Sequence, residues 1–263
     1  MVQVCLTERF LKIGHIWFAG SDTDGKQPYD ICYFHDIAEL HSPKNWHEVH
    51  NTLVSNLIEP EESLFGRVDK KFRSCIRKGT KDNLVHRVYG PEDVLNNRGL
   101  LETFASVYQQ MLVGKKLPGS LNIGELLAYA RQNALLITTA SLDGMPLVYH
   151  SYLFDAANAR CLHSCSAFRE ESESGERNVY GTANKWLHWQ DMCHLKSRGI
   201  ANYDWGGVFS YDGANGVDTF KLAFGGEPRR YYNEIVLCSV RGKVLKQVAD
   251  FTRKMLGRER AGR

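Results

Sequence analysis

The chain has 263 residues, of which 43% are hydrophobic and 24% charged, and its formal net charge is +3. This is the composition of an ordinary globular protein, long enough for one large domain or two smaller ones. The small net charge gives no argument for nucleic-acid binding, and no apolar run is long enough to predict a membrane-spanning helix.

The N-terminal residues and the cysteines favour a cytoplasmic protein. Residues 1–11 include Glu8 and Arg9 and lack the apolar core of a signal peptide. The seven cysteines are odd in number and widely scattered, which favours reduced thiols. Cys161, His163 and Cys165 alternate, so we expect them on one face of a strand. No second ligand pair follows them, and we expect packing rather than a metal site.

The first part of the chain gives few regular patterns. Residues 20–25 are rich in Gly, Ser and Asp and predict a loop. The apolar residues between 46 and 57 recur at a helical spacing and predict a helix there. Residues 64–68 predict a short strand.

The pattern becomes clearer from Gly90 onward. Pro91 suits the first turn of a helix, Asp143-Gly144 is typical of a hairpin turn, and Gly199 is typical of a helix C-terminus. The predicted elements are helices over 91–111, 124–132 and 182–198 and strands over 134–140, 147–154, 160–167 and 200–205. This order indicates the α+β class.

Three segments carry a resemblance to a known family. They are Lys70-Lys71-Phe72-Arg73-Ser74-Cys75-Ile76-Arg77-Lys78-Gly79, then Tyr203-Asp204-Trp205-Gly206-Gly207, and Phe220-Lys221-Leu222-Ala223-Phe224-Gly225-Gly226. In this order they resemble the motifs R-x-x-I-R-K-A, Y-D-x-G-G and F-K-x-x-F-G-G of the Fem-type transferases. That family belongs to the acetyltransferase-like (GNAT) superfamily.

The resemblance implies a GNAT-like α+β fold, in which helices flank a mixed or antiparallel central sheet. Fem-type enzymes of peptidoglycan bridge synthesis usually carry two full GNAT-like domains. We therefore expect an abridged N-terminal subdomain over 1–89, a full acyltransferase domain over 90–256 and a basic tail over 257–263. Residues 244–256 show the spacing of an amphipathic helix.

The implied activity is acyl transfer to an amine. The donor would be an aminoacyl-tRNA or an acyl-CoA, used as a co-substrate, with no permanently bound cofactor and no metal. The acceptor would be an amine of a cell-envelope, polysaccharide or peptide natural-product precursor. Direct attack by the amine is expected, because the sequence lacks a nucleophile motif. The alternative is a non-catalytic anion- or nucleotide-binding module on a decayed GNAT scaffold.

Lys221 is the first candidate catalytic residue. The resemblance gives it a role in substrate binding or catalysis. Phe220 and Phe224 would partly desolvate its ammonium group, which strengthens its attraction for a phosphate or a developing oxyanion. The alternative is a surface lysine beside core aromatic residues.

Asp204 is the second candidate. It is predicted at a strand end, where it would accept the proton of the amine or bond the backbone of the Gly206-Gly207 turn. Both roles remain open from sequence alone. Its neighbours Tyr203 and Trp205 are predicted substrate contacts, together with Phe220.

The basic segment 67–87 holds eight Lys or Arg against two acids. On a helix, Lys70, Arg73 and Arg77 share one face, and Lys78 lies beside it. These four are predicted to bind phosphate, with a solvated charged face as the alternative.

A second anion site is predicted at 178–183. Asn178, Gly181 and Ala183 match the pyrophosphate-binding pattern Q/R-x-x-G-x-G/A incompletely, in a loop expected directly before a helix. The alternative is an ordinary loop with Thr182 as N-cap.

Overall fold

The computed structural model describes residues 1–8, 10–20, 23, 28–167, 174–213 and 215–244. The chain divides into two compact units: unit 1 comprises Met1–His50 and Tyr231–Arg263, and unit 2 comprises Asn51–Arg230. Among the described residues, no helix combines the length and the apolar character that a membrane crossing requires.

Unit 1 is a small sheet built from both ends of the chain. Its strands are β1 (Val2–Glu8), β2 (Leu11–Trp17), β3 (Ile31–Ile37) and the last part of β10 (Glu227–Leu237), in the order β1-β2-β3-β10. The pairs β1/β2 and β3/β10 are antiparallel, and β2/β3 is parallel. Ile16, Cys32, Phe34 and Ile37 form its buried core.

Unit 2 contains the remaining elements. They are β4 (Trp46–Asn56), of which residues 51–56 belong to unit 2, α1 (Glu61–Arg67), α2 (Lys70–Lys81), β5 (Val85–Tyr89), α3 (Pro91–Asn96), α4 (Arg98–Gly114), α5 (Ile123–Arg131), β6 (Leu135–Leu142), β7 (Met145–Phe154), β8 (Asn158–Ser166), α6 (Ser174–Ser197), β9 (Asn202–Gly207) and α7 (Gly216–Leu222).

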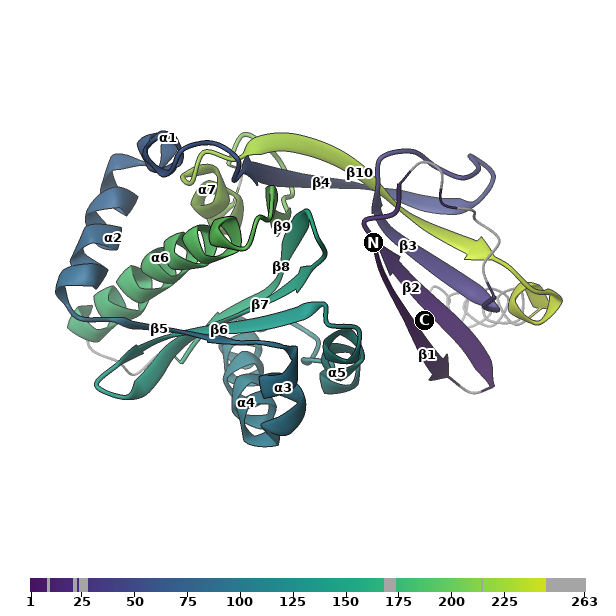
Figure 1. Ribbon diagram of the computed structural model, residues 1–263, viewed down its shortest axis with the longest axis horizontal. Helices are drawn as coiled ribbons and strands as arrows, with labels where there is room; N and C mark the ends of the chain where they lie inside the picture. The colour runs from purple at the N-terminus through teal and green to yellow at the C-terminus, as the bar shows by residue number, and fades with distance from the viewer. Residues whose placement is uncertain (9, 21–22, 24–27, 168–173, 214, 245–263) are drawn as a thin grey trace, which may run out of the picture. The chain divides into compact units, whose positions relative to one another are not determined.

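The sheet of unit 2 has the strand order β4-β9-β8-β7-β6-β5. The pair β8/β9 is parallel and the others are antiparallel, so the sheet is mixed. Helix α6 covers one face of β6–β8, and α3–α5 cover the opposite face (Figure 1). The predicted α+β class, with a mixed sheet between helices, is confirmed.

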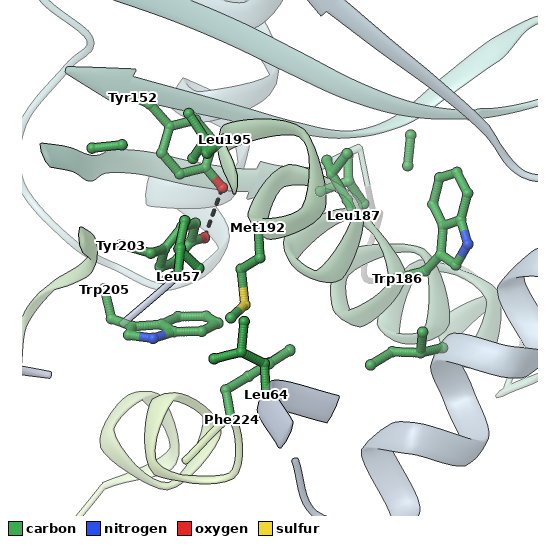
Figure 2. Packing of buried hydrophobic residues seen from close by; sticks show 14 of the residues in the cluster. Leu57, Leu64, Tyr152, Trp186, Leu187, Met192, Leu195, Tyr203, Trp205 and Phe224 are labelled. Carbon is green, nitrogen blue, oxygen red and sulfur yellow. Dashed lines mark hydrogen bonds between the residues drawn. The ribbon is translucent and has the colours of Figure 1, made fainter. Parts of the chain in front are cut away.

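The hydrophobic core of unit 2 lies between α6 and the sheet. Trp186, Leu187, Met192 and Leu195 of α6 are buried there, and α1, α2, β7, β9 and α7 add further apolar side chains (Figure 2). Helix α2 packs closely on α6, because a Cβ atom at Gly79 would lie 2.7 Å from the ring of Trp186. This contact fixes the predicted basic helix to the core.

Two local predictions in the first part of the chain are wrong. Residues 46–56 form strand β4, and their helical spacing is incidental because Trp46 and Val49 are exposed. Residues 64–67 lie in helix α1, in which acidic residues occupy the first turn and Leu64 is buried, and Val68 follows the helix as its C-cap.

The predictions after Gly90 are closer to the structure. Asp143 and Gly144 both have positive φ, at 50° and 81°, and form the predicted turn between β6 and β7. The single helix expected over 91–111 is two helices, because the side chain of Asn97 caps α4 at Leu100 N. The helix predicted at 244–256 and the basic tail lie outside the described residues, apart from Val244.

The domain boundary expected at 89/90 differs from the observed division. It falls inside unit 2, where β5 precedes it and pairs with β6 on its far side. Residues 51–89 supply α1, α2 and β5 to the unit that contains the motifs. An N-terminal subdomain over 1–89 is therefore not a compact unit of the structure.

Candidate functional site

Lys221 lies near the end of helix α7, beside the end of β9. The side chain of Asn215 caps α7 by accepting hydrogen bonds from Val217 N and Asp218 N. The Nζ atom of Lys221 donates to the carbonyl oxygen of Gly207 at 2.6 Å. The third motif is thereby brought to the last residue of the second motif.

The surroundings of Lys221 lower its pKa. Burial is the largest cause, and the nearby Arg160 acts in the same direction, whereas Cys161, Asp204 and Asp218 act against it. A desolvated ammonium group interacts more strongly with an anion than an exposed one does. The electrostatics therefore fit the anion-binding role predicted for Lys221.

Aromatic side chains from α2, β9 and the segment around α7 pack together. Phe220 of α7 and Phe224, just after this helix, lie with ring centroids 5.5 Å apart, and Phe72 of α2 is 5.3 Å and 5.4 Å from them, respectively. Trp205 of β9 lies 4.4 Å from Phe224. We refer to Phe72, Trp205, Phe220 and Phe224 as the aromatic cluster.

The carboxylate of Asp204 hydrogen-bonds the backbone of the Gly206-Gly207 turn. Its Oδ1 atom accepts hydrogen bonds from Thr52 Oγ1 at 2.5 Å and from Gly206 N at 2.7 Å. Its Oδ2 atom lies 3.3 Å from Nη1 of Arg160. Of the two roles open from the sequence, this geometry favours the structural one, since three donors already occupy the carboxylate.

Tyr203 and Trp205 do not reach a ligand surface. Tyr203 has no exposed surface, and its hydroxyl bonds Tyr152 and His188. Trp205 is also buried, and its Nε1 atom donates to Ser55 Oγ at 3.0 Å. The substrate contacts predicted for these two residues are corrected to packing and internal hydrogen bonding.

The basic helix predicted at 70–78 is confirmed as part of α2, but its cations lie in different settings. Arg73 donates to the carbonyl oxygen of Gly66, and the guanidinium of Arg77 stacks over Phe65. Lys78 pairs with Asp82, and Lys70 is exposed. Two of the four predicted phosphate ligands therefore lean towards α1.

The predicted donor loop is helical. Helix α6 begins at Ser174, so Asn178, Gly181 and Ala183 lie within it and not in a loop before it. Ala183 is fully buried, and the carbonyl oxygen of Gly181 accepts a hydrogen bond from Nζ of Lys185. The backbone N–H groups of these residues are inside the helix, where they are not free for a pyrophosphate in the way that first-turn N–H groups are.

Lys185 is a cation that sequence analysis missed. Its Nζ atom lies 4.9 Å from the ring centroid of Phe72, over one side of the aromatic cluster. The spacing of Gly181 and Lys185 in α6 is one helical turn, which explains their hydrogen bond at 3.0 Å. Lys185 of α6 thus lies at the cluster, and Lys221 of α7 follows Phe220, one of its members, in the sequence.

A buried hydrogen-bond network lies between α6 and the sheet. At its centre is Asp191, whose carboxylate accepts from His86 Nε2 at 2.9 Å, Thr138 Oγ1 at 3.0 Å, His150 Nδ1 at 2.8 Å and the Tyr152 hydroxyl at 2.7 Å. Burial alone would raise the pKa of Asp191, but the hydrogen bonds and charges of His150 and His86 outweigh it and lower the pKa.

The network continues from Tyr152 to His188. The hydroxyls of Tyr152 and Tyr203 lie 2.8 Å apart, and the hydroxyl of Tyr203 lies 2.8 Å from Nδ1 of His188 (Figure 2 shows the first contact). His188 is buried, and its ring contacts Trp205, Phe220 and Phe224 at centroid distances of 5.0–5.7 Å. Burial, reinforced by His150, lowers its pKa well below the ordinary value.

Sequence analysis missed this network because its members are far apart in the chain. His150 and His188 show no acidic partner at a telling spacing in the sequence, yet their ring centroids lie 4.0 Å apart, and both belong to the network, His150 through Asp191 and His188 through Tyr203. The only local signal was the spacing of His188 and Asp191 by three positions on α6.

The residues Cys161, His163 and Cys165 do not share one face of β8. The pairs Ser151↔His163 and Tyr152↔Cys161 show one extra residue in β8 at this point, a β-bulge. It turns Cys161 towards the Lys221 side, whereas His163 contacts Phe104 and Tyr108 of α4. No group of residues suited to a metal ion occurs in the part of the chain that the structure describes.

The mixed sheet of unit 2 thus lies between α6 on one face and α3–α5 on the other, with the three motifs on α2, on β9 and around α7. No known protein family matches the chain as a sequence, and no curated protein does. Solved structures do match. FemX has a TM-score of 0.55 at 13% identity, over 79% of this chain and 65% of the FemX chain, slightly less than two thirds of it.

Two further structures agree. The C-terminal domain of a putative lysylphosphatidylglycerol synthetase from Agrobacterium fabrum has a TM-score of 0.51 at 12% identity, over 84% of this chain and 72% of its own. L-PGS from Bacillus licheniformis has a TM-score of 0.51 at 13% identity, over 82% and 71%, respectively. This likeness is one of fold: the chain shares its fold with FemX and with the two lysylphosphatidylglycerol synthetase structures, which confirms the Fem-like fold that the motifs predict.

Proposed function

We propose that the protein is an acyltransferase that moves an aminoacyl group from aminoacyl-tRNA, or an acyl group from acyl-CoA, onto an amine. The acceptor is an amine of a cell-envelope, polysaccharide or peptide natural-product precursor. The observation that carries the proposal is the position of Lys221: a partly buried ammonium group at the end of β9, bonded to Gly207, in a segment whose aromatic residues Phe220 and Phe224 pack on each other.

The chemistry follows from this position. The amine nitrogen attacks the ester or thioester carbonyl carbon, and the carbonyl electron pair moves to the oxygen. The ammonium group of Lys221 stabilises that oxyanion in surroundings of low dielectric constant. The intermediate then collapses, the bond to the tRNA oxygen or the CoA sulfur breaks, and the nitrogen loses its proton.

Cations around the aromatic cluster suit a donor that carries phosphates. Lys185 lies over Phe72, and α2 presents Lys70 close in sequence to that same residue. The solved neighbours favour an aminoacyl donor, since the name lysylphosphatidylglycerol synthetase denotes a lysyl group joined to a lipid. The helical state of residues 178–183 removes the loop that favoured acyl-CoA.

A thermal-shift measurement distinguishes the donors. Purified protein is heated alone, with acetyl-CoA, with charged tRNA and with uncharged tRNA. Saturation at a hundred times Kd adds about 2.7 kcal/mol to the free energy of unfolding, which raises Tm by about 5–10 °C for a unit of this size. A rise with charged tRNA that exceeds the rise with uncharged tRNA supports the aminoacyl donor.

Turnover then separates an enzyme from a binding module. The protein is incubated with a mixture of tRNAs charged with radiolabelled amino acids, or with acetyl-CoA, and a panel of primary amines. Label in an amide product supports the transferase. Binding of a donor without any transfer across the panel contradicts the transferase and favours an anion-binding module on this fold.

A further inference from the structure

The buried network around Asp191 is unusual for a core that apolar residues could fill. Asp191, His150, Tyr152 and Tyr203 are each 1% exposed or less, and His188 is 3% exposed. Burial of so many polar groups is unfavourable unless every one of them is hydrogen-bonded. Hydrogen bonds connect these groups in one chain, from the carboxylate of Asp191 to the imidazole of His188 beside the aromatic cluster, and this arrangement requires an explanation.

Counting protons along the network fixes the direction of each hydrogen bond. Asp191 is ionised, since its pKa is lowered, and its carboxylate therefore only accepts. His150 Nδ1 lies 2.8 Å from that carboxylate and must carry a proton, so it cannot accept from the Tyr152 hydroxyl 3.2 Å away. The single hydroxyl proton of Tyr152 is therefore donated to Asp191.

The remaining two bonds follow from this one. The oxygen of Tyr152 accepts the proton of Tyr203, because the proton of Tyr152 is already committed. The oxygen of Tyr203 must then accept from Nδ1–H of His188. His188 is neutral, because its pKa is lowered well below the ordinary value, so its one ring proton is on Nδ1. Its Nε2 atom carries a lone pair.

The Nε2 atom of His188 is not used by the network. No residue that the structure describes hydrogen-bonds Nε2 of His188. The ring is in contact with Phe220, the residue before Lys221, and its electrostatic environment includes the charge of Lys221. The charge of Lys221 therefore acts on the ring that carries this free nitrogen.

We propose that Nε2 of His188 accepts the proton of the attacking amine, and that Tyr203, Tyr152 and Asp191 are positioning residues that keep it available. This inference rests on the proposed function. The nitrogen of the amine becomes much more acidic as it bonds the carbonyl carbon, so a weakly basic imidazole suffices. The proton passes to Nε2, and the resulting imidazolium returns it to the leaving oxygen or sulfur, which restores neutral His188.

The network has a specific part in this step. An imidazolium at His188 donates a stronger hydrogen bond through Nδ1–H to Tyr203, and Tyr203 and Tyr152 relay the polarisation to the Asp191 carboxylate. The positive charge is thereby stabilised in a buried place where it would otherwise be unfavourable. A hydrogen-bonded partner also holds the ring in one tautomer, as in other sites with an oriented histidine base.

The tautomer is tested by NMR without any substrate. The full chain is labelled with ¹⁵N-histidine, and long-range ¹H–¹⁵N correlations are recorded at pH 7, with His188→Gln to assign the signals. The expected result is a protonated Nδ1 and an unprotonated Nε2 at His188. In Tyr203→Phe, which lacks the accepting oxygen, we expect Nε2–H to become the major form. A protonated Nε2 in the wild type overturns the proposal, and so does an unchanged tautomer in a folded Tyr203→Phe variant.

The proton transfer is tested by single-turnover rates with charged tRNA and the best amine of the panel. We expect His188→Gln to reduce the rate about 100-fold with little change in donor affinity. Glu102→Gln, an exposed change on α4, is the matched control and should retain the wild-type rate. Transfer at the wild-type rate by His188→Gln overturns the role of His188 and leaves the proposed function intact. Absence of transfer by the wild type with every donor overturns both, whereas the tautomer is decided by NMR alone.

Discussion

The hydroxyl groups of Tyr152 and Tyr203 lie 2.8 Å apart, although β8 separates their strands in the sheet. The contact crosses from β7 to β9 beneath α6, where Asp191 and His188 bond the two ends of the pair. Tyr203 of the Y-D-W-G-G segment is therefore buried, and its hydroxyl hydrogen-bonds Nδ1 of His188 in α6. In the same segment, the carbonyl oxygen of Gly207 accepts a hydrogen bond from Lys221, and Gly206 lies close to that side chain.

Replacement of Lys221 by alanine should abolish most transfer and leave the fold intact. The side chain supplies the positive charge nearest the glycine turn, and loss of one such donor reduces turnover by about 100-fold or more. The measurement is the single-turnover rate together with the circular dichroism spectrum. Lys44→Ala, an exposed change in unit 1, is the control. Equal rates in the wild type and Lys221→Ala would remove Lys221 from the site.

Replacement of Asp204 by asparagine should destabilise the protein more than it slows chemistry. The change removes the negative charge opposite the buried Arg160, and breaking one side of a buried pair reduces the free energy of unfolding by about 3 kcal/mol. Urea denaturation measures this loss. Asp82→Asn breaks an exposed pair with Lys78 and should have little effect. Wild-type stability combined with a large loss of turnover would instead make Asp204 the base.

The contact between α2 and α6 is tested at Gly79. A methyl group there would lie 2.7 Å from the Trp186 ring, so Gly79→Ala should reduce the free energy of unfolding by about 1–3 kcal/mol. Gly66→Ala is the matched control, because a Cβ at Gly66 meets nothing within 4 Å. The control should keep or slightly increase the stability, since alanine favours a helix. Equal stability of the two variants would show that α2 and α6 are not in close contact.

Acid should destabilise unit 2 through histidines that are buried in the neutral form. Burial lowers the pKa of His163 to about 4, so between about pH 6.5 and pH 4 the unfolded chain binds a proton that the folded chain does not. The free energy of unfolding therefore falls with falling pH, by about 1.4 kcal/mol per pH unit for this residue. His163→Gln should flatten the dependence in urea titrations from pH 7 to pH 5. A slope equal to that of the wild type would contradict the buried neutral state.

The sequence predicted the fold best where local chemistry decides the backbone. The Asp143-Gly144 turn and Gly199 fixed element ends in the second half, because positive φ angles favour such residues. Residues 46–57 were predicted wrongly, since pairing with β9 determines the strand and that partner is distant in the chain. Helix α6 begins at Ser174, earlier than the predicted start at residue 182, so Gly181 lies inside the helix and not in a loop before it.

Only part of the candidate site could be predicted, because some of its contacts join residues that are far apart in the chain. The F-K-x-x-F-G-G segment identified Lys221 as a candidate, and the fold places that residue beside Gly207. The network could not be predicted, because Asp191, Tyr152 and His188 meet only after α6 has packed on the sheet. The bulge in β8 is likewise a property of strand register, which alternation in the sequence does not reveal.

Unit 1 is assembled from two segments that are far apart in the chain, and this has a consequence for protein synthesis. Strands β1–β3 leave the ribosome before unit 2, but the part of β10 that pairs with β3 follows only after unit 2. At about 5–20 residues per second, the edge of β3 waits roughly 10–40 s for its partner. An unpaired strand edge is a template for wrong association. A ribosome that stalls before residue 231 therefore exposes an aggregation-prone nascent chain, one that a chaperone must shield until translation resumes.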